Sequence, residues 1–162
     1  MNKDISRFDR ILCPLDGSKN GEAALPYVES LAITTKAEIV LLQVVTPHHY
    51  DIELAEHYTS HVGRLTEEYI LHASASAKEY LDTIKERLTK LKIAVSYEVK
   101  VDSPAKTIVS YAEENNIDLI AISTHGRSGI SRWLLGSVAD KVLHTTDIPV
   151  LLVRAFTEST EK

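Results

Sequence analysis

Apolar residues follow two patterns that alternate along the chain. Short runs of branched apolar residues are typical of buried parallel strands, and longer stretches with an apolar residue every three or four positions are typical of helices that cover a sheet. The short runs predict strands at 11–15, 37–45, 94–101, 119–122 and 149–153. The helical spacing predicts helices at 20–35, 67–91, 103–115 and 136–145.

The order of these elements predicts an α/β fold. Strands and helices alternate from the first strand to the last, and each helix is long enough to cross over between two parallel strands. We therefore expect a single-domain, open five-stranded parallel sheet with helices on both faces. The third strand alternates apolar and polar residues, so we expect it nearer an edge, and Pro14 is expected at the carboxyl end of the first strand.

Composition agrees with one folded domain. The 162 residues, 44% of them hydrophobic, are enough for a single sizeable core. We expect one domain over 1–162, with an ordered core of about 8–155 and a mobile polar tail at 156–162.

Charge and cysteine content restrict the partners and the compartment. A formal net charge of −5 argues against nucleic-acid binding, which needs a basic surface. No segment has the length and apolarity of a membrane span or a secretory signal. The single cysteine, Cys13, lies in an apolar run and is expected to be buried and inert. We therefore expect a cytoplasmic protein without a membrane partner.

Stretch 46–63 has no clear period and predicts a loop, with or without a short helix. It holds four histidines, at positions 48, 49, 57 and 61. His57 and His61 would share one face of a helix and could then bind a metal. Their spacing fixes no acidic or cysteine ligand, so exposure to solvent is the favoured interpretation, and we assign no metal site.

Residues that could bind a ligand follow the ends of two predicted strands, the first and the fourth. The fourth strand runs into a loop with Gly126 and Gly129, and the next helix opens at Gly136-Ser137. Glycines let a backbone approach a ligand closely, and unpaired N–H groups at a helix start attract anions. Asp16 follows the first strand. If these two strands are neighbours, Asp16 and Gly126 face one crevice at the point where the strand order reverses.

Familiar catalytic and nucleotide motifs are absent from this region. The chain lacks G-x-x-x-x-G-K-[ST] and lacks G-x-G-x-x-G after a strand. Gly126-Arg-Ser-Gly129 is not the G-x-S-x-G of a nucleophile elbow. A receiver-like phosphorylation switch would need further acidic residues and a lysine that these strand ends do not supply. Asp16-Gly17-Ser18 could also be only a turn with helix-cap chemistry.

The same segments resemble the universal stress protein (UspA-type) family over nearly the whole chain. The segments that carry the resemblance are Ile11-Leu-Cys-Pro-Leu-Asp-Gly-Ser18, Leu41-Leu-Gln-Val44, Ser123-Thr-His-Gly-Arg-Ser-Gly129, Leu135-Gly-Ser-Val138 and Pro149-Val-Leu-Leu-Val-Arg154. The nucleotide-binding branch of the family carries G-x-x-G-x₉-G-[ST], which falls here on positions 123, 126, 136 and 137. Position 123 is serine instead of glycine. The resemblance implies a Rossmann-like fold of the adenine nucleotide alpha hydrolase-like kind.

The resemblance also implies a role for each site residue. Asp16 would contact the ribose, and Pro14 and Val44 would line the adenine pocket. The phosphates would be held by Gly126, Gly129, Gly136 and Ser137. Ser123, at the first position of the motif, would be a neighbour of the phosphates. Apart from the resemblance, the place of Arg127 in the loop suits a neighbour that neutralises phosphate charge, and the alternative is a solvated surface arginine.

The implied function is that of an ATP-binding stress-response module without fast catalysis, with or without Mg²⁺. No general base or metal-carboxylate cluster is visible in the sequence. The alternative is a slow nucleotide hydrolase or transferase that uses Mg-ATP, with Asp16 placing the metal. The resemblance further implies a homodimer that pairs through the last strand, Pro149–Val153, which is expected at a sheet edge.

Overall fold

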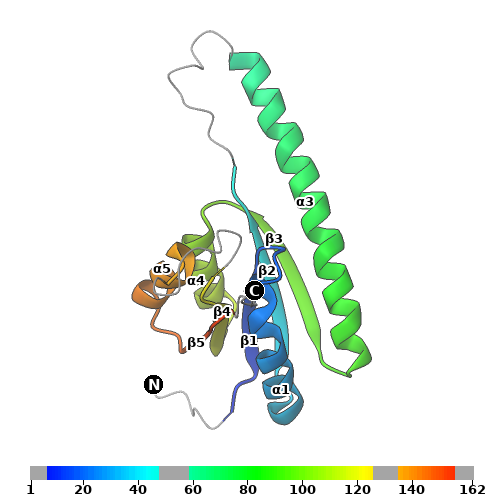
Figure 1. Ribbon diagram of the computed structural model, residues 1–162, viewed down its shortest axis with the longest axis vertical. Coiled ribbons are helices and arrows are strands. Elements are labelled where there is room, and N and C mark those ends of the chain that lie inside the picture. Colours follow the sequence, from blue (N-terminus) through cyan, green and yellow to red (C-terminus); the bar gives the residue numbers. More distant parts are fainter. Residues whose placement is uncertain (1–6, 48–58, 126–134, 156–162) are drawn as a thin grey trace, which may run out of the picture.

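The computed structural model describes residues 7–47, 59–125 and 135–155 of the 162-residue chain. The tail at 156–162 lies outside these residues, so its mobility stays a prediction. Within the described residues the chain forms one five-stranded sheet with helices on both sides (Figure 1).

All five strands run parallel, in the order β3-β2-β1-β4-β5. Their bounds are β1 Arg10–Leu15, β2 Glu38–Val45, β3 Val95–Val101, β4 Leu119–Ser123 and β5 Val150–Val153. The predicted five-stranded parallel α/β fold is confirmed, as are the edge positions of the third and fifth strands. Because the strand order reverses between β1 and β4, the carboxyl ends of these two neighbours form the expected ligand-binding edge.

The helices divide between the two faces of the sheet. A 3-10 turn, η1 (Gly21–Ala24), helix α1 (Leu25–Thr35) and helix α3 (Thr59–Lys90) pack against one face. Helices α4 (Pro104–Glu114) and α5 (Ser137–Thr145) pack against the other. Figure 1 shows α3 and the α4–α5 pair on opposite sides of the sheet, with the first turns of α3 projecting well beyond it.

Strand β2 shows why the apolar runs are continuous. Ile39 and Leu41 face α1 and α3, whereas Val40 and Leu42 face α4 and α5. All four side chains are fully buried. Because successive residues of a strand point to opposite faces, a strand covered on both faces needs an apolar residue at nearly every position.

Two helices begin at other residues than predicted. The first helical segment starts with η1, and the α-helix itself begins only at Leu25, with Pro26 in its first turn, where a missing N–H is tolerated. Helix α3 begins at Thr59, so the final residues of the predicted loop 46–63 are helical. The spacing rule detects a buried face, and the early turns of α3 at Gly63, Arg64 and Leu65 are exposed.

Helix α4 begins and ends as predicted. Ser103 occupies the N-cap position and Pro104 the first turn, although the Ser103 side chain makes no capping hydrogen bond. The helix ends at Glu114, and Asn116 adopts a left-handed conformation with φ 52°. Asparagine tolerates this conformation better than most residues and commonly ends helices. Helix α4 therefore starts at the same edge of the sheet as the carboxyl ends of the strands.

Strands β1 and β4 separate toward their carboxyl ends. Strand β1 pairs with β2 along its whole length, but it pairs with β4 only at Ile11 and Leu12. Pro14 follows two residues later, near the carboxyl end of β1 as predicted, and it has no N–H to donate to a neighbouring strand. A crevice can therefore form between the two strand ends.

Candidate functional site

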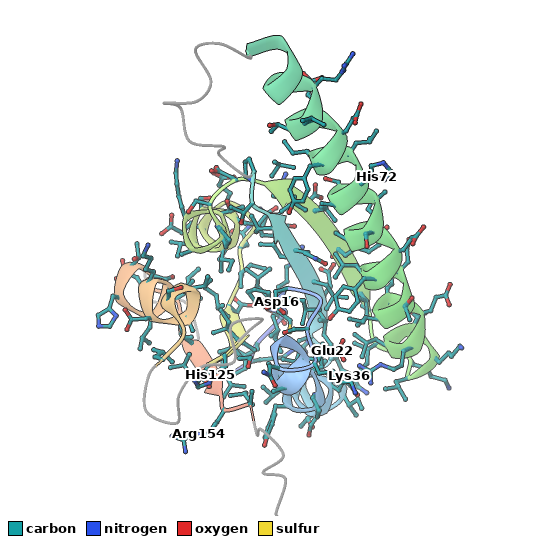
Figure 2. All side chains as sticks on the ribbon, turned by 45° about the horizontal axis from the view of Figure 1, so that its top comes forward. Asp16, Glu22, Lys36, His72, His125 and Arg154 are labelled. Carbon is teal, nitrogen blue, oxygen red and sulfur yellow. The ribbon has the colours of Figure 1, made fainter. Side chains whose placement is uncertain are left out.

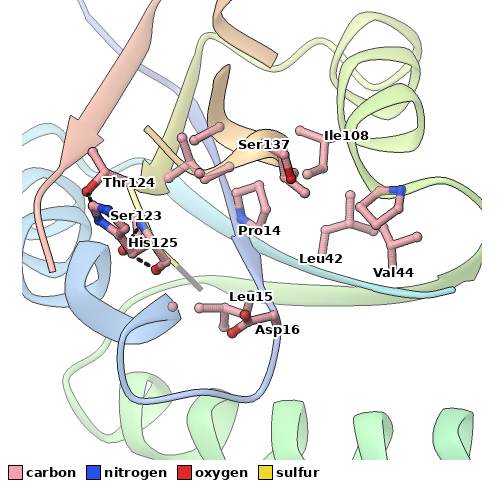
Figure 3. Close-up of a pocket in the computed structure, with 16 residues that line it drawn as sticks. Pro14, Leu15, Asp16, Leu42, Val44, Ile108, Ser123, Thr124, His125 and Ser137 are labelled. Atoms are coloured by element: carbon pink, nitrogen blue, oxygen red, sulfur yellow. Dashed lines mark hydrogen bonds between the residues drawn. The ribbon is translucent and has the colours of Figure 1, made fainter. Parts of the chain in front are cut away.

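A cavity of about 280 Å³ lies at the carboxyl ends of the strands, at the small end of the range for small-molecule sites. Figure 3 shows Asp16 on one side of this cavity and Ser137 on the other, with Pro14 between them. The described residues that line it are Pro14, Leu15, Asp16, Gly21, Leu42, Val44, Pro104, Ile108, Ile122, Ser123, Thr124, His125, Gly136, Ser137, Val138 and Ala139.

Six of the residues predicted from the sequence lie around this cavity. They are Pro14, Asp16, Val44, Ser123, Gly136 and Ser137. Three others, Gly126, Arg127 and Gly129, lie outside the described residues, so their roles remain predictions. The fold thus brings together residues that are up to 123 positions apart in the chain.

One wall of the cavity is apolar and comes from three elements. Leu42 and Val44 project from β2, Ile122 from β4 and Ile108 from the first turns of α4. Leu42, Ile108 and Ile122 are buried, and Val44 is half-buried at the opening. Branched side chains of this kind offer a flat aromatic ring dispersion contacts and an environment free of water.

Asp16 is held in a tight turn. Its Oδ1 accepts hydrogen bonds from the Ser18 backbone N–H at 3.0 Å and from the Ser18 hydroxyl at 2.7 Å. The Gly21 N–H in turn donates to Ser18 Oγ at 3.0 Å. Gly17 has φ 80°, a conformation that favours glycine. Asp16-Gly17-Ser18 is therefore a turn closed by side-chain hydrogen bonds, and its carboxylate also lines the cavity.

Gly21 completes this turn by close contact. A Cβ built on Gly21 would lie 2.3 Å from Asp16 Oδ1. No other residue type fits there without moving the carboxylate. The position of Asp16 therefore depends on the start of η1 packing against it.

The opposite side of the cavity is formed by the end of β4 and the start of α5. Gly136 is the N-cap residue of α5, and its N–H donates to the Thr124 carbonyl at 2.8 Å. A Cβ on Gly136 would meet the same carbonyl oxygen at 2.8 Å. The strand end and the helix start are thus in direct contact, and the first N–H groups of α5 are available to an anion.

Ser123 and His125 are engaged with each other and with Thr124. The Ser123 hydroxyl donates to the His125 carbonyl at 2.9 Å, and the His125 N–H approaches Ser123 Oγ at 3.4 Å. His125 Nδ1 lies 2.9 Å from Thr124 Oγ1 (Figure 3). Its Nε2 is buried without a hydrogen-bond partner within the described part of the chain. The serine at the motif's first position therefore organises the start of the loop through its hydroxyl.

Sequence reasoning missed several lining residues, above all Gly21, Pro104 and Ile108. Pro104 and Ile108 are one turn apart at the start of α4. The sequence could have indicated them because this helix begins just after the end of a strand. Gly21 could have been suspected from its place after the Asp16 turn. None of the three belongs to the motif that drew attention to the site.

Cys13 is buried in β1, as predicted, and takes no part in the cavity. Burial, with a smaller contribution from the negative charge of Glu29, raises the pKa of its thiol to about 12. The thiol is therefore protonated at neutral pH, which agrees with the expected inert cysteine.

Neither a metal cluster nor a membrane helix is found among the described residues. No group of three or more His, Cys, Asp or Glu side chains is placed to hold an ion. No helix in the described ranges is long and apolar enough to cross a membrane. The histidines at 48, 49, 57 and 61 lie outside the residues whose side chains are described, so their exposure stays a prediction.

The chain matches a family model over most of its length. The model for the universal stress protein family matches residues 7–154. Universal stress protein MJ0577 of Methanocaldococcus jannaschii is 28% identical over 162 residues, covering 91% of this chain and 95% of its own. The solved structure of MJ0577 has a TM-score of 0.79 at 28% identity, covering 93% of this chain and 99% of its own.

Two further solved structures with this fold are complexes with adenine nucleotides. A universal stress protein in complex with cAMP has a TM-score of 0.61 at 19% identity, covering 93% of this chain and 100% of its own. A universal stress protein from Archaeoglobus fulgidus in complex with dAMP has a TM-score of 0.58 at 18% identity, covering 90% and 97% respectively. At these identities the likeness establishes a shared fold.

Proposed function

Because the chain belongs to the universal stress protein family, we propose that it binds ATP and acts as a nucleotide-dependent module of a stress response, without fast catalysis. One observation carries the proposal. A carboxylate, Asp16, and a helix start, Gly136-Ser137, lie on opposite sides of one largely apolar cavity. Adenosine phosphates combine the matching groups in one molecule: a hydroxyl-bearing sugar, an anionic end and a flat apolar base.

Each part of the nucleotide has a counterpart in the cavity. The adenine would pack on the apolar wall beside Pro14 and Val44. The ribose hydroxyls would donate to Asp16, since a carboxylate accepts several hydrogen bonds. The phosphates would meet the first N–H groups of α5 and the Ser137 hydroxyl.

The remaining phosphate contacts rest on the motif. Gly126 and Gly129 would complete the cradle, as the family resemblance implies, and Arg127 between them would neutralise phosphate charge. Ser123 would act indirectly, since its hydroxyl already bonds the His125 backbone. The cAMP and dAMP complexes of related folds support an adenine nucleotide as the class of ligand.

Fast hydrolysis has little support in the cavity. Among its described lining residues Asp16 is the sole carboxylate, and its Oδ1 already accepts two hydrogen bonds from Ser18. Such a group is suited to hold ribose hydroxyls rather than to activate water. Mg²⁺, where it takes part, would arrive with the triphosphate and neutralise part of its charge.

Assembly and compartment complete the proposal. Strand β5 is an edge strand of the sheet, and unpaired edges are templates for pairing with another chain. We propose a homodimer through Pro149–Val153. We also propose a cytoplasmic location, since one buried thiol and no disulfide suit a reducing compartment.

Mass spectrometry of small molecules released from the purified protein tests the ligand. Protein prepared without added nucleotide should release ATP or a related adenine nucleotide, and titration calorimetry should then give a measurable ATP affinity. An empty protein that shows no heat of binding with ATP would refute the proposed function.

The enzyme alternative is tested by turnover. Purified protein with ATP and Mg²⁺ should release phosphate very slowly. Turnover that is readily measured in the unsubstituted protein and lost in Asp16→Asn, at unchanged ATP affinity, would show that Asp16 acts in catalysis and would favour the hydrolase or transferase.

A further inference from the structure

A part-buried hydrogen bond joins helix α3 to the turn η1, which follows Asp16. The Tyr80 hydroxyl donates a hydrogen bond to Glu22 Oε1 at 2.9 Å. The two residues are 58 positions apart, with Glu22 in η1 and Tyr80 near the middle of α3. The Tyr80 ring packs on the core beneath α3. The contact therefore fixes the four-residue turn η1 against a long helix.

Glu22 is one residue from the group that positions Asp16. The Glu22 N–H donates to the Ser18 carbonyl at 3.2 Å. Its neighbour Gly21 donates to Ser18 Oγ and lies in close contact with the Asp16 carboxylate. Figure 2 shows Asp16 and Glu22 near one another, with Glu22 on the side toward α3. A continuous series of contacts thus runs from Tyr80 to Asp16.

We propose that Tyr80 is a positioning residue for the ribose end of the nucleotide site, acting through Glu22 and the turn at 16–22. The inference rests on the proposed function, because the role of Asp16 as ribose acceptor comes from it. Tyr80 itself does not line the cavity. Its effect on binding comes from holding η1, and through Gly21 the Asp16 carboxylate, in place.

The turn gains from such an anchor because it is short, and of its residues only Gly21 and Ala24 are buried. Segment η1 is a single 3-10 turn without a side-chain cap, and isolated 3-10 turns have poor hydrogen-bond geometry. Gly17 and Gly21 also leave the backbone more conformational freedom than other residues would. Without an anchor, the turn loses more entropy when a ligand requires one position of Asp16.

The hydroxyl of Tyr80 remains a donor at all ordinary pH values. Burial raises its pKa above the usual value, and the hydrogen bond to Glu22 and the negative charges of Glu22 and Asp16 raise it further. The positioning effect should therefore not vary between about pH 6 and pH 9.

The test is the Tyr80→Phe variant, which keeps the ring and its packing. Its affinity for ATP should fall about fivefold by calorimetry, because the hydroxyl bond to a charged group is lost. Its affinity for 2′,3′-dideoxy-ATP should equal that of the unsubstituted protein, since this ligand has no ribose hydroxyls for Asp16. A uniform loss for both ligands would mean general damage and would overturn the proposal.

Tyr97→Phe is the matched control. Asp82 of α3 lies close enough to the Tyr97 hydroxyl to raise its pKa, but Tyr97 lies on β3 and does not line the cavity. This variant should bind ATP as the unsubstituted protein does. Among Glu22 variants, Glu22→Gln keeps an acceptor for Tyr80 and should retain affinity, whereas Glu22→Ala should lose as much as Tyr80→Phe.

Hydrogen exchange tests the anchor without nucleotide. In the ligand-free protein, amides of the turn at 16–22 should exchange at least about threefold faster in Tyr80→Phe and unchanged in Tyr97→Phe. Unchanged exchange, or unchanged ATP affinity in Tyr80→Phe, would overturn the positioning role. Absence of ATP binding in the unsubstituted protein would instead refute the proposed function, while the exchange result would still decide the anchor.

Discussion

The two faces of the sheet differ in how far their packing extends toward the carboxyl ends of the strands. On the face covered by α1 and α3, packing continues to the end of β2, where Val45 is 6% exposed. On the face covered by α4 and α5, Val40 is fully buried but Val44 opens into the cavity. Strand β2 is therefore packed to its end on the α1–α3 face. On the α4–α5 face its packing ends at the cavity, which Val44 lines.

The difference follows from where the helices begin and end. Helix α3 runs along the whole length of the sheet and beyond it (Figure 1). Helices α4 and α5 are much shorter, and both start near the carboxyl ends of the strands. Their starts leave space between them and bring backbone N–H groups toward that space. Substitutions in the core beneath α3 and substitutions at the cavity should therefore affect different properties, and Tyr80, which reaches η1, is the exception.

The largest effect should come from the closed face. Leu81 of α3 is fully buried in the core beneath that helix, so Leu81→Ala should lower the free energy of unfolding by about 2–5 kcal/mol. Denaturant unfolding measures this loss. The folded fraction should bind ATP as before, and a large change in its affinity would contradict the separation of the two faces.

Gly136→Val should instead weaken ATP binding and leave the cooperative fold intact. Its Cβ would lie 2.8 Å from the Thr124 carbonyl oxygen, so the start of α5 must move away from the end of β4. ATP affinity should fall more than about 100-fold, equivalent to about 3 kcal/mol, while unfolding remains cooperative. Gly63→Val is the control, since its Cβ would meet no atom within 4 Å. Retained ATP binding in Gly136→Val would place the phosphate site elsewhere.

Two valines on one strand give a finer comparison. Val40 and Val44 point to the same face of the sheet, the first into the core and the second into the cavity. Val40→Ala should cost about 1–3 kcal/mol of stability with little effect on ATP binding. Val44→Ala should weaken ATP binding about threefold to tenfold with a smaller loss of stability. If both variants changed ATP affinity equally, Val44 would not contact the adenine.

The smallest effect is expected at the surface of the closed face. Arg87 of α3 lies 2.8 Å from Glu29 of α1, with the Arg87 side chain 52% exposed and the Glu29 side chain 16% exposed. Because one end of the pair is in water, its attraction is screened, so Arg87→Ala should cost only about 1 kcal/mol, and less in high salt. Thermal unfolding at two salt concentrations measures it. A loss well above this range, unaffected by salt, would show that packing of the arginine stem matters more than its charge.

Much of the fold could be predicted from the sequence because its signals are local. Continuous apolar runs such as 37–45 predicted strands covered on both faces, and the spacing of Ala77, Leu81 and Ile84 predicted the buried side of α3. Both patterns depend on the repeat of one element, which is 2 residues for a strand and 3.6 for a helix. The first turns of α3 escaped prediction because they lie beyond the sheet and bury no regular face.

Of the candidate site, the sequence by itself determined the residues that carry the family motif. Asp16 after an apolar run, and Gly136-Ser137 at a helix start, could be identified from neighbouring residues alone. Only the tertiary structure decided that β1 and β4 are neighbours, which puts Asp16 and Ser137 around one cavity. It also decided that Ile108 joins the apolar wall and that Tyr80 holds Glu22. Such contacts join distant segments through the packing of whole elements, and no local pattern records which distant segments will meet.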